Sequence, residues 1–375
     1  MNLKQISTLI NETIVPNTLG EGTTIAEDLS NIVDLGTAIA DLTADDMKNF
    51  TKDFIVGIAK NFFDTRLYEG SDYGLFSDFQ TYGGIVQRVK ASLLETEDSP
   101  IWTLENGTDY FDGVYRGVST SNKIYTQDSI WKIANSIPVE QFKQYFLSPE
   151  GVEQLISLIE STVENTLRRN IHALSKRTLC QLIGEAKQIH LLTQYASESG
   201  RTLTAQEALL DKDFQLWLGV VIMRLRDMVT EYNEKYNDGT IETFTPKEDT
   251  RVTILSEVDK KMNFFMTSDV FHNDLVSIGK YNTINFWQNQ GTGLLPSLGV
   301  TAEIKLTDGE TQPTITDLTN VIGVIYDKYS AGVTARLDKV TAQYIANGDY
   351  TNYFHHVANR RFVDTRNTAI ALILD

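Results

Sequence analysis

The residue types that most often do chemistry in proteins are present in this chain, but their spacing forms no known catalytic motif. The sequence has no Gly-x-Ser-x-Gly elbow, no phosphate loop ending in Gly-Lys-Ser/Thr and no His-Glu-x-x-His zinc pair. The glycine pairs at 20/22 and 291/293 lack the third glycine of a dinucleotide site, and we interpret them as turns. We therefore predict no catalytic residue, no metal and no cofactor.

The histidines and the single cysteine have simple structural interpretations. His355 and His356 are adjacent in a segment predicted as a strand, where successive side chains face opposite sides, so they cannot easily chelate one metal. The other three histidines are scattered, and structural or surface roles are favoured for them. Cys180 lies in a stretch with helical periodicity, which predicts a buried small hydrophobe rather than a reactive thiol.

Charged residues crowd a glycine-rich segment between residues 67 and 122. Its carboxylates include Glu95, Glu97, Asp98, Glu105, Asp109 and Asp112. Their spacing does not match a calcium loop, so we interpret them as a solvated or partner-facing rim, with a weak cation site as the lesser alternative. Arg88 and Lys90 lie in a strand-like beginning of the segment and are candidates to meet such acidic residues across a contact between subunits; ordinary strand solubility is the alternative.

The segment that carries these charges is not expected to fold by itself. Its glycines alternate with aromatic residues, and the pairs Asn106-Gly107 and Asp112-Gly113 predict turns. A two-stranded excursion of this kind exposes backbone edges and aromatic surface, so we expect it to lie on a neighbouring chain. A large loop that covers its own core is the alternative.

A long amphipathic helix is the strongest prediction from the sequence. Ser148 suits the N-cap, Pro149 the first helical position, and Glu150 the positive end of the helix dipole. Apolar residues then recur at helical spacing at Val152, Leu155, Ile156, Ile159, Val163, Leu167, Ile171, Leu174, Leu182, Ile183, Ala186 and Ile189. The pattern predicts a helix of about 48 residues, ending near 196 and roughly 70 Å long. That length suits a structural spine better than a catalytic pocket.

The elements predicted around this spine mix helices and strands, which indicates an α+β fold. We predict one strand over 123–137, helices over 211–236 and 268–276, and buried strands over 251–255 and 321–326. Strands are also predicted at 353–357, 362–363 and 368–374, and an amphipathic helix begins after Thr43.

Composition limits the function classes further. The 375 residues, 41% of them hydrophobic, can bury a sizeable core in two or three substructures. Fifty acidic and 33 basic residues give a formal charge of −17, which opposes sequence-reading contact with nucleic acid and disfavours anionic membranes. The charge still permits a container that holds DNA without binding it tightly, although solubility is its commoner explanation. We see no membrane-spanning run and no signal peptide, and expect synthesis in the cytosol.

The order of these parts resembles the major capsid proteins of tailed bacteriophages, which share the HK-ninety-seven-type shell fold. In that family an arm precedes an extended loop, a strand and a spine helix follow, and a mixed domain leads to strands that return to the first sheet. Two short runs resemble the small short-tailed phage branch: Val324-Ile325-Tyr326-Asp327-Lys328 and Tyr350-x-x-Tyr353-Phe354-His355-His356.

The resemblance implies a division of the chain and a structural role. It implies an N-terminal arm and helix (1–66), an extended loop (67–122), a peripheral domain with the spine helix (123–205), an axial domain (206–345) and returning strands of the peripheral domain (346–375). It also implies a non-enzymatic protein that assembles as hexamers and pentamers into an icosahedral head around double-stranded DNA. The implied location is the virion, with assembly in the host cytoplasm.

The partners that the resemblance implies are copies of the chain itself, a portal, scaffold or decoration proteins, and non-specifically held DNA, with no membrane. Some relatives crosslink a lysine of the extended loop to an asparagine of a neighbouring subunit, but beside Lys90 nothing marks such a partner residue. Two alternatives stay open: an α+β enzyme or ligand-binding protein whose site is assembled from distant residues, and another virion structural protein such as a tail protein.

Overall fold

A computed structural model of the chain describes residues 86–94, 96–113, 116–125, 128–145, 149–269, 281–287, 304–305, 317–318 and 320–375, together with 75–76 and seven single positions before them. The predicted helix after Thr43 and most of the predicted arm lie outside the described residues, as do Glu95 and the predicted N-cap Ser148. In the part of the chain that the structure describes, no helix is long and apolar enough to cross a membrane.

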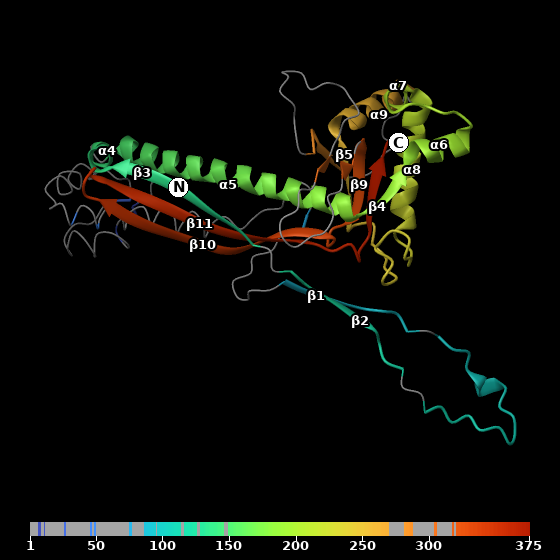
Figure 1. Cartoon of the computed structure of the whole chain (residues 1–375). Helices are drawn as coiled ribbons and strands as arrows, with labels where there is room; N and C mark the ends of the chain where they lie inside the picture. Colours follow the sequence, from blue (N-terminus) through green and yellow to red (C-terminus); the bar gives the residue numbers. More distant parts are fainter. Residues whose placement is uncertain are drawn as a thin grey trace.

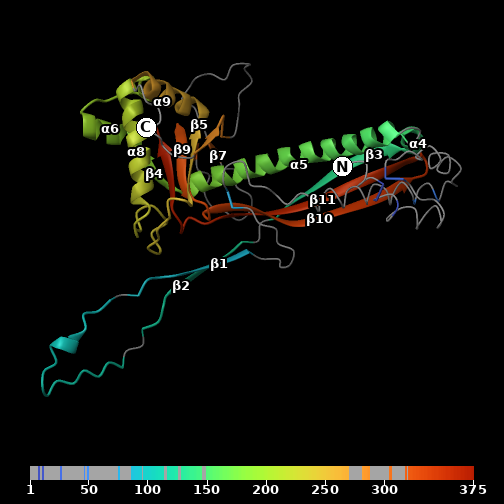
Figure 2. The same cartoon turned by 180° about the vertical axis from the view of Figure 1, so that it is seen from behind.

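The molecule has an elongated body with a compact region at one end and a projecting hairpin (Figures 1 and 2). The body consists of helix α5 (Pro149–Glu185) lying along a three-stranded antiparallel sheet. The strands of this sheet follow the order β10 (Ala331–Ile345), β11 (Tyr350–Val363) and β3 (Asp128–Pro138). The short helix α4 (Val139–Tyr145) connects β3 to α5. The hairpin is formed by β1 (Val86–Ala91) and β2 (Thr120–Tyr125), with a 3-10 turn, η2 (Pro100–Trp102), farther out.

The compact region is built on a five-stranded sheet of order β4, β12, β9, β5, β6. Its strands are β4 (Lys187–His190), β12 (Ala369–Ile373), β9 (Val321–Asp327), β5 (Thr250–Leu255) and β6 (Asn282–Ile284). In the described residues it is accompanied by the helices α6 (Leu191–Ser199), α7 (Ala205–Leu210), α8 (Lys212–Met228) and α9 (Ser256–Asp269). The strands β7 (Ile304–Lys305) and β8 (Asp317–Leu318) form a separate short pair.

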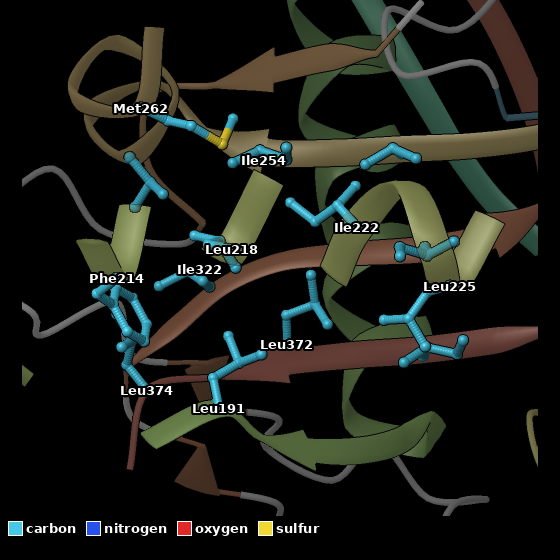
Figure 3. Packing of buried hydrophobic residues seen from close by; sticks show 14 of the residues in the cluster. Leu191, Phe214, Leu218, Ile222, Leu225, Ile254, Met262, Ile322, Leu372 and Leu374 are labelled. Carbon is cyan, nitrogen blue, oxygen red and sulfur yellow. The ribbon is translucent and has the colours of Figure 1, made fainter. Parts of the chain in front are cut away.

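The central strands of this sheet bury both of their faces, which explains their continuous apolar sequence. Every residue of β9 and β12 is buried, and the buried strands predicted at 251–255 and 321–326 are confirmed. Residues 369, 371 and 373 of β12 join the core beside the end of α5, where Cys180 is buried as predicted. Residues 370, 372 and 374 join the core beneath α6, α8 and α9 (Figure 3).

The long helix is confirmed in place but is shorter than predicted. It has 37 residues, which corresponds to about 55 Å, and it ends at Glu185 rather than near 196. Ala186 and Ile189 fit a helical stripe, but residues 187–190 pair in parallel with β12 as strand β4. A local apolar pattern cannot distinguish these two outcomes, because the pairing partner lies nearly 200 residues away in the sequence.

Other predicted elements differ in extent for similar reasons. The single strand predicted over 123–137 is divided between β2, which pairs with β1, and β3, which pairs with β11. The helix predicted over 211–236 ends at Met228, and the two strands predicted at 353–357 and 362–363 form one strand, β11. Strand β10 was not predicted, and residues 270–276 of the helix predicted at 268–276 lie outside the described residues.

Strand pairing does not follow the predicted segment boundaries. β10 falls within the segment 206–345 that was predicted to be axial, yet it pairs along its length with β11 and lies in the sheet with β3. β12 falls within the predicted returning segment 346–375 but pairs with β9 and β4. β10 joins the sheet of the body because it continues directly into β11 through a hairpin turn, in which Asp349 has a left-handed conformation. The peripheral and axial assignments stay predictions.

Truncation of a core leucine tests the packing in Figure 3. Leu218 of α8 is fully buried among residues of α9 and of strands β5, β9 and β12, so Leu218→Ala should lower the free energy of unfolding by about 2–5 kcal/mol. Val220 lies two residues farther along the same helix with its side chain exposed, and Val220→Ala should change stability by about 0.5 kcal/mol or less. Urea unfolding of both variants measures the difference; equal effects would contradict the described packing.

Candidate functional site at the hairpin base

The hairpin is a two-stranded ribbon that its own ladder cannot hold firmly. β1 and β2 pair from Val86 with Tyr125 to Ala91 with Thr120, and just beyond this ladder the backbone N–H of Ser92 donates to the carbonyl oxygen of Ser119 at 2.8 Å. An isolated two-stranded ribbon is marginally stable in water. The contacts at its base therefore determine how firmly the hairpin is held and in which direction it leaves the body.

A buried ion pair lies at this base, in the connection between β11 and β12. Arg366 and Asp364 have side chains that are 1% and 0% exposed. They form a bidentate pair, with Nε to Oδ1 and Nη2 to Oδ2 both at 2.8 Å. Parallel bonds of this kind fix the plane of the guanidinium as well as its position.

The remaining donors of Arg366 bind both strands of the hairpin. Nη1 donates to the carbonyl and the hydroxyl oxygens of Ser121 in β2, at 2.8 and 3.0 Å. Nη2 donates to the carbonyl oxygen of Arg88 in β1 at 3.1 Å. A guanidinium has five N–H donors, and these bonds together with the ion pair use all five. Arg366 is therefore fully satisfied although it is buried.

Two side chains of the hairpin donate in turn to carbonyl oxygens of the body, one in the same turn and one in the connection between β9 and β10. Lys90 Nζ donates to the carbonyl oxygen of Arg366 at 2.8 Å, and Arg88 donates to the carbonyl oxygen of Tyr329. The Arg88 guanidinium also lies 3.7 Å from Asp364 Oδ2 and 5.3 Å from the ring centre of Phe362. We call the residues Arg88, Lys90, Ser121, Asp364 and Arg366 the hairpin clamp.

Burial and charge have opposing effects on the pKa values within the clamp. Burial would raise the pKa of Asp364, but the hydrogen bonds and charge of Arg366 hold it below its ordinary value. Burial lowers the pKa of Lys90 to about 8, and the charge of Asp364 only partly opposes this shift. Asp364 is thus charged at neutral pH. Lys90 is the clamp residue whose shifted pKa lies nearest to neutral pH.

Glu97, Asp98, Glu105, Asp109 and Asp112, the predicted acidic residues that the structure describes, lie beyond the ladder and away from Arg88 and Lys90. Glu97 and Asp112 both pair with Arg116, with Arg116 Nε 3.0 Å from Glu97 Oε1. Asp109 Oδ1 accepts from the backbone N–H of Phe111 at 2.9 Å, and the backbone N–H of Glu105 donates to the hydroxyl of Tyr110. Asp98 is exposed. Within one chain the structure therefore does not bring the two predicted groups together, and their contact between subunits stays a prediction.

The sequence interpretation missed Asp364, Arg366, Ser121 and Arg116. One signal was available: Asp364 and Arg366 lie in a short polar stretch between two predicted strands, and charged residues between two buried strands need a partner. The identity of that partner was not readable, because Ser121 and Arg88 are more than 240 residues away. In the described residues, no group of three or more His, Cys, Asp or Glu side chains could hold a metal ion.

Large apolar side chains are exposed on the far part of the hairpin. Trp102 is 93% exposed and Phe111 86% exposed, and they are accompanied by Leu93, Leu94, Ile101 and Leu104. We call these six residues the hairpin tip. Large exposed apolar side chains gathered in one short segment mark an interaction site.

Comparison with known proteins shows the family to which the chain belongs. The chain matches the model of the Phi29-like phage major capsid protein family over residues 12–372, nearly its whole length. It is thus a capsid protein of the virion and belongs to the Phi29-like phage major capsid protein family. The predicted α+β capsid fold and the predicted major capsid role are confirmed.

No curated protein matches the chain. Among solved structures, it is similar to the capsid of cyanophage P-SCSP1u, with 11% identity over 83% of this chain and 90% of that chain, at a TM-score of 0.48. The capsid of Staphylococcus phage Andhra shows 12% identity over 83% and 86% of the two chains, at a TM-score of 0.43. The capsid of Helicobacter pylori bacteriophage KHP30 shows 9% identity over 82% and 88%, at a TM-score of 0.46.

Removal of Arg366 should release the hairpin. Arg366→Met leaves Asp364 as a buried carboxylate without its cation and removes the bonds to both strands, so stability should fall by about 3–5 kcal/mol. Hydrogen exchange of the amides in β1 and β2 should accelerate in the same variant. Arg366→Lys keeps the positive charge but loses the forked donor geometry, so its effect should be intermediate. It is the variant to measure if Arg366→Met does not fold.

Arg116→Met is the matched control, because it removes an arginine whose ion pairs are exposed and should change stability by about 1 kcal/mol or less. Unchanged exchange in β1 and β2 of a folded Arg366 variant would contradict the clamp.

The shifted pKa of Lys90 should make the free energy of unfolding of the chain depend on pH. Its pKa is about 8 in the folded chain, below the ordinary lysine value of 10.5 that applies to the unfolded chain, so between these two values the unfolded chain binds more protons. The wild type should therefore gain stability from this group as the pH rises above 8, whereas below pH 8 the burial penalty is fully present. Lys90→Met lacks this titration.

The free energy of unfolding of the wild type, relative to that of Lys90→Met, should consequently rise between about pH 7.5 and pH 9.5 in urea unfolding, because the folded chain loses the proton of Lys90 before the unfolded chain does. Lys235→Met, at an exposed lysine of the compact region, should show no such trend. A pH-independent difference for Lys90→Met would show that Lys90 is not buried as described.

Proposed function

We propose that the chain assembles as hexamers and pentamers into an icosahedral head that encloses double-stranded DNA, and that it has no enzymatic activity. One observation carries the proposal most directly: a firmly clamped hairpin ends in an exposed apolar tip. A second copy of the chain provides the surface that would cover this tip. Family membership supports self-association into a shell.

The hairpin tip has the composition of an interface core. Aromatic side chains bury roughly 150–250 Å² each and dominate interface energetics. Trp102 and Phe111 would supply two such anchors. The carboxylates around them would form a polar rim, which suits contacts that recur at every subunit rather than one strong pair. Among the predicted contact residues, we propose Glu95, Glu97, Asp98, Glu105, Asp109 and Asp112 for this rim.

Arg88 and Lys90 take a different part in the proposal. Both are bonded within their own chain, and the Arg88 side chain is only 24% exposed. Their main role would be to hold the hairpin at a fixed angle, so that its tip reaches the same place on each neighbour. A direct contact of either residue with a neighbouring subunit is the smaller part of the proposal.

The remaining features of the proposal concern the whole particle. α5 would act as the spine of a peripheral domain, and the compact region would face the centre of each ring of subunits as the axial domain. A portal, and scaffold or decoration proteins, would be the other protein partners. Assembly would take place in the host cytoplasm.

Electron microscopy tests assembly itself. The chain is expressed with a scaffold or protease supplied where needed, and the products are imaged in negative stain. Closed polyhedral shells, or rings of five and six subunits, are the expected result. A species that stays monomeric in the presence of scaffold would overturn the proposal. A discrete small oligomer with saturable ligand binding would instead favour the enzyme or ligand-binding alternative.

Substitution of the hairpin tip should abolish shells without unfolding the subunit. Trp102→Ser combined with Phe111→Ser removes the two most exposed aromatic side chains of the hairpin tip, so shells should be lost while the thermal unfolding midpoint changes little. Leu210→Ser is the control, because Leu210 is 70% exposed in the compact region. Shells formed normally by the double variant, or lost equally in the control, would contradict a specific role for the tip.

A further inference from the structure

Helix α5 separates its charges along its length. Its acidic residues before the middle are Glu150, Glu153, Glu160 and Glu164, and no acidic residue occurs from 165 to 184. Within that stretch lie Arg168, Arg169, His172, Lys176 and Arg177. The helix dipole favours cations near the C-terminal end only within the last turn, and these residues begin well before it. In a chain with a net charge of −17, this local excess of positive charge needs another explanation.

The arginines of this stretch spread over about half of the helix circumference. At about 100° per residue, Arg169 lies between Arg168, about 100° away around the axis, and Arg177, about 80° away on the other side and about 12 Å farther along the helix. Arg168, Arg169 and Arg177 are exposed. Because the helix lies on a sheet, these charges are held on a rigid surface rather than on a mobile tail.

The neighbouring strand adds to this positive surface instead of neutralising it. Burial lowers the pKa of Arg361 in β11, and the charge of Arg177 lowers it further, so the two guanidinium groups repel each other. Among the described residues, Glu164 pairs with Arg168, and the charge of Glu185 acts on Arg361. Positive side chains outnumber negative ones along this described part of α5 and at Arg361, and a bound polyanion would relieve the repulsion between Arg177 and Arg361.

This face lacks the anchors of a protein interface. The large exposed apolar side chains are located on the hairpin, on β3, in the compact region and in its loops, and none of those described lies on α5. Arginine-rich, apolar-poor surface is typical of contact with a phosphate backbone, whereas protein interfaces have buried aromatic or aliphatic centres. In both views α5 lies on one side of β10 and β11, and the hairpin leaves on the other side (Figures 1 and 2).

We propose that the C-terminal half of α5, with Arg168, Arg169, Arg177 and the adjacent Arg361, is the surface that contacts the phosphate backbone of duplex DNA. The inference rests on the proposed function, because it names the face of the subunit that would line the interior of the head. A few exposed arginines per subunit give weak, non-specific contacts that are repeated over the whole shell. The acidic remainder of the chain would limit the total affinity, so that the DNA is held without being immobilised.

Duplex binding by the unassembled full-length chain tests the proposal. The variant Arg169→Gln with Arg177→Gln is compared with Lys235→Gln with Lys260→Gln, which removes the same charge from exposed positions of the compact region. Binding to a 30-base-pair fluorescent duplex is measured by anisotropy across a salt series. The α5 variant should bind roughly tenfold more weakly, and its dependence of log K on log salt should lose about 1.8 in slope, as expected for two phosphate contacts.

Three outcomes would overturn the proposal. They are an equal loss in the control variant, no binding of the duplex by the wild type even at low salt, and equally tight, α5-dependent binding of polyglutamate, which would indicate an acidic protein partner. Shell formation by the same variants is recorded separately by microscopy. Shells that form while α5-dependent DNA binding is absent would reject this inference and leave the proposed assembly intact.

Discussion

The arrangement of the hairpin depends on one buried arginine. Arg366 has five N–H donors, and a single unsatisfied donor in a buried site would destabilise the fold. Asp364 takes two of them, and the hairpin strands take the rest through Ser121 and Arg88. The ribbon therefore cannot leave its place without exposing a buried charge. A segment that would be marginal by itself acquires a defined direction in this way.

The same turn connects the two sheets of the molecule. Asp364 and Arg366 follow β11 of the body and precede β12 of the compact region. Backbone bonds support this junction from several sides, including Asp327 N to Thr368 O at 3.0 Å and Ala369 N to Tyr236 O at 2.9 Å. The hairpin is thus anchored where body and compact region meet, so a force on its tip would act on both.

The body and the compact region contribute different physical properties to the subunit. α5 and its three-stranded sheet provide length, because a helix supported along one side resists bending. The compact region provides most of the described apolar core, since both faces of its central strands are covered. The acidic and apolar hairpin serves neither purpose within one subunit. A division into a rigid support, a stable core and an uncovered arm is consistent with a protein whose role is carried out by its surfaces.

The amino-acid sequence by itself determined the class of fold, the position of the long helix, two buried strands and the burial of Cys180. These follow from local patterns, namely helical periodicity after Pro149 and continuous apolar runs. The tertiary structure alone decided where α5 ends, since residues 187–190 pair with β12, and how β10 and β11 join. It also decided the clamp, because Arg366 reaches partners that no local pattern connects to it. Which distant segments pair depends on which arrangement buries the apolar side chains and satisfies the polar groups of the whole chain at once. Only the folded chain fixes that arrangement.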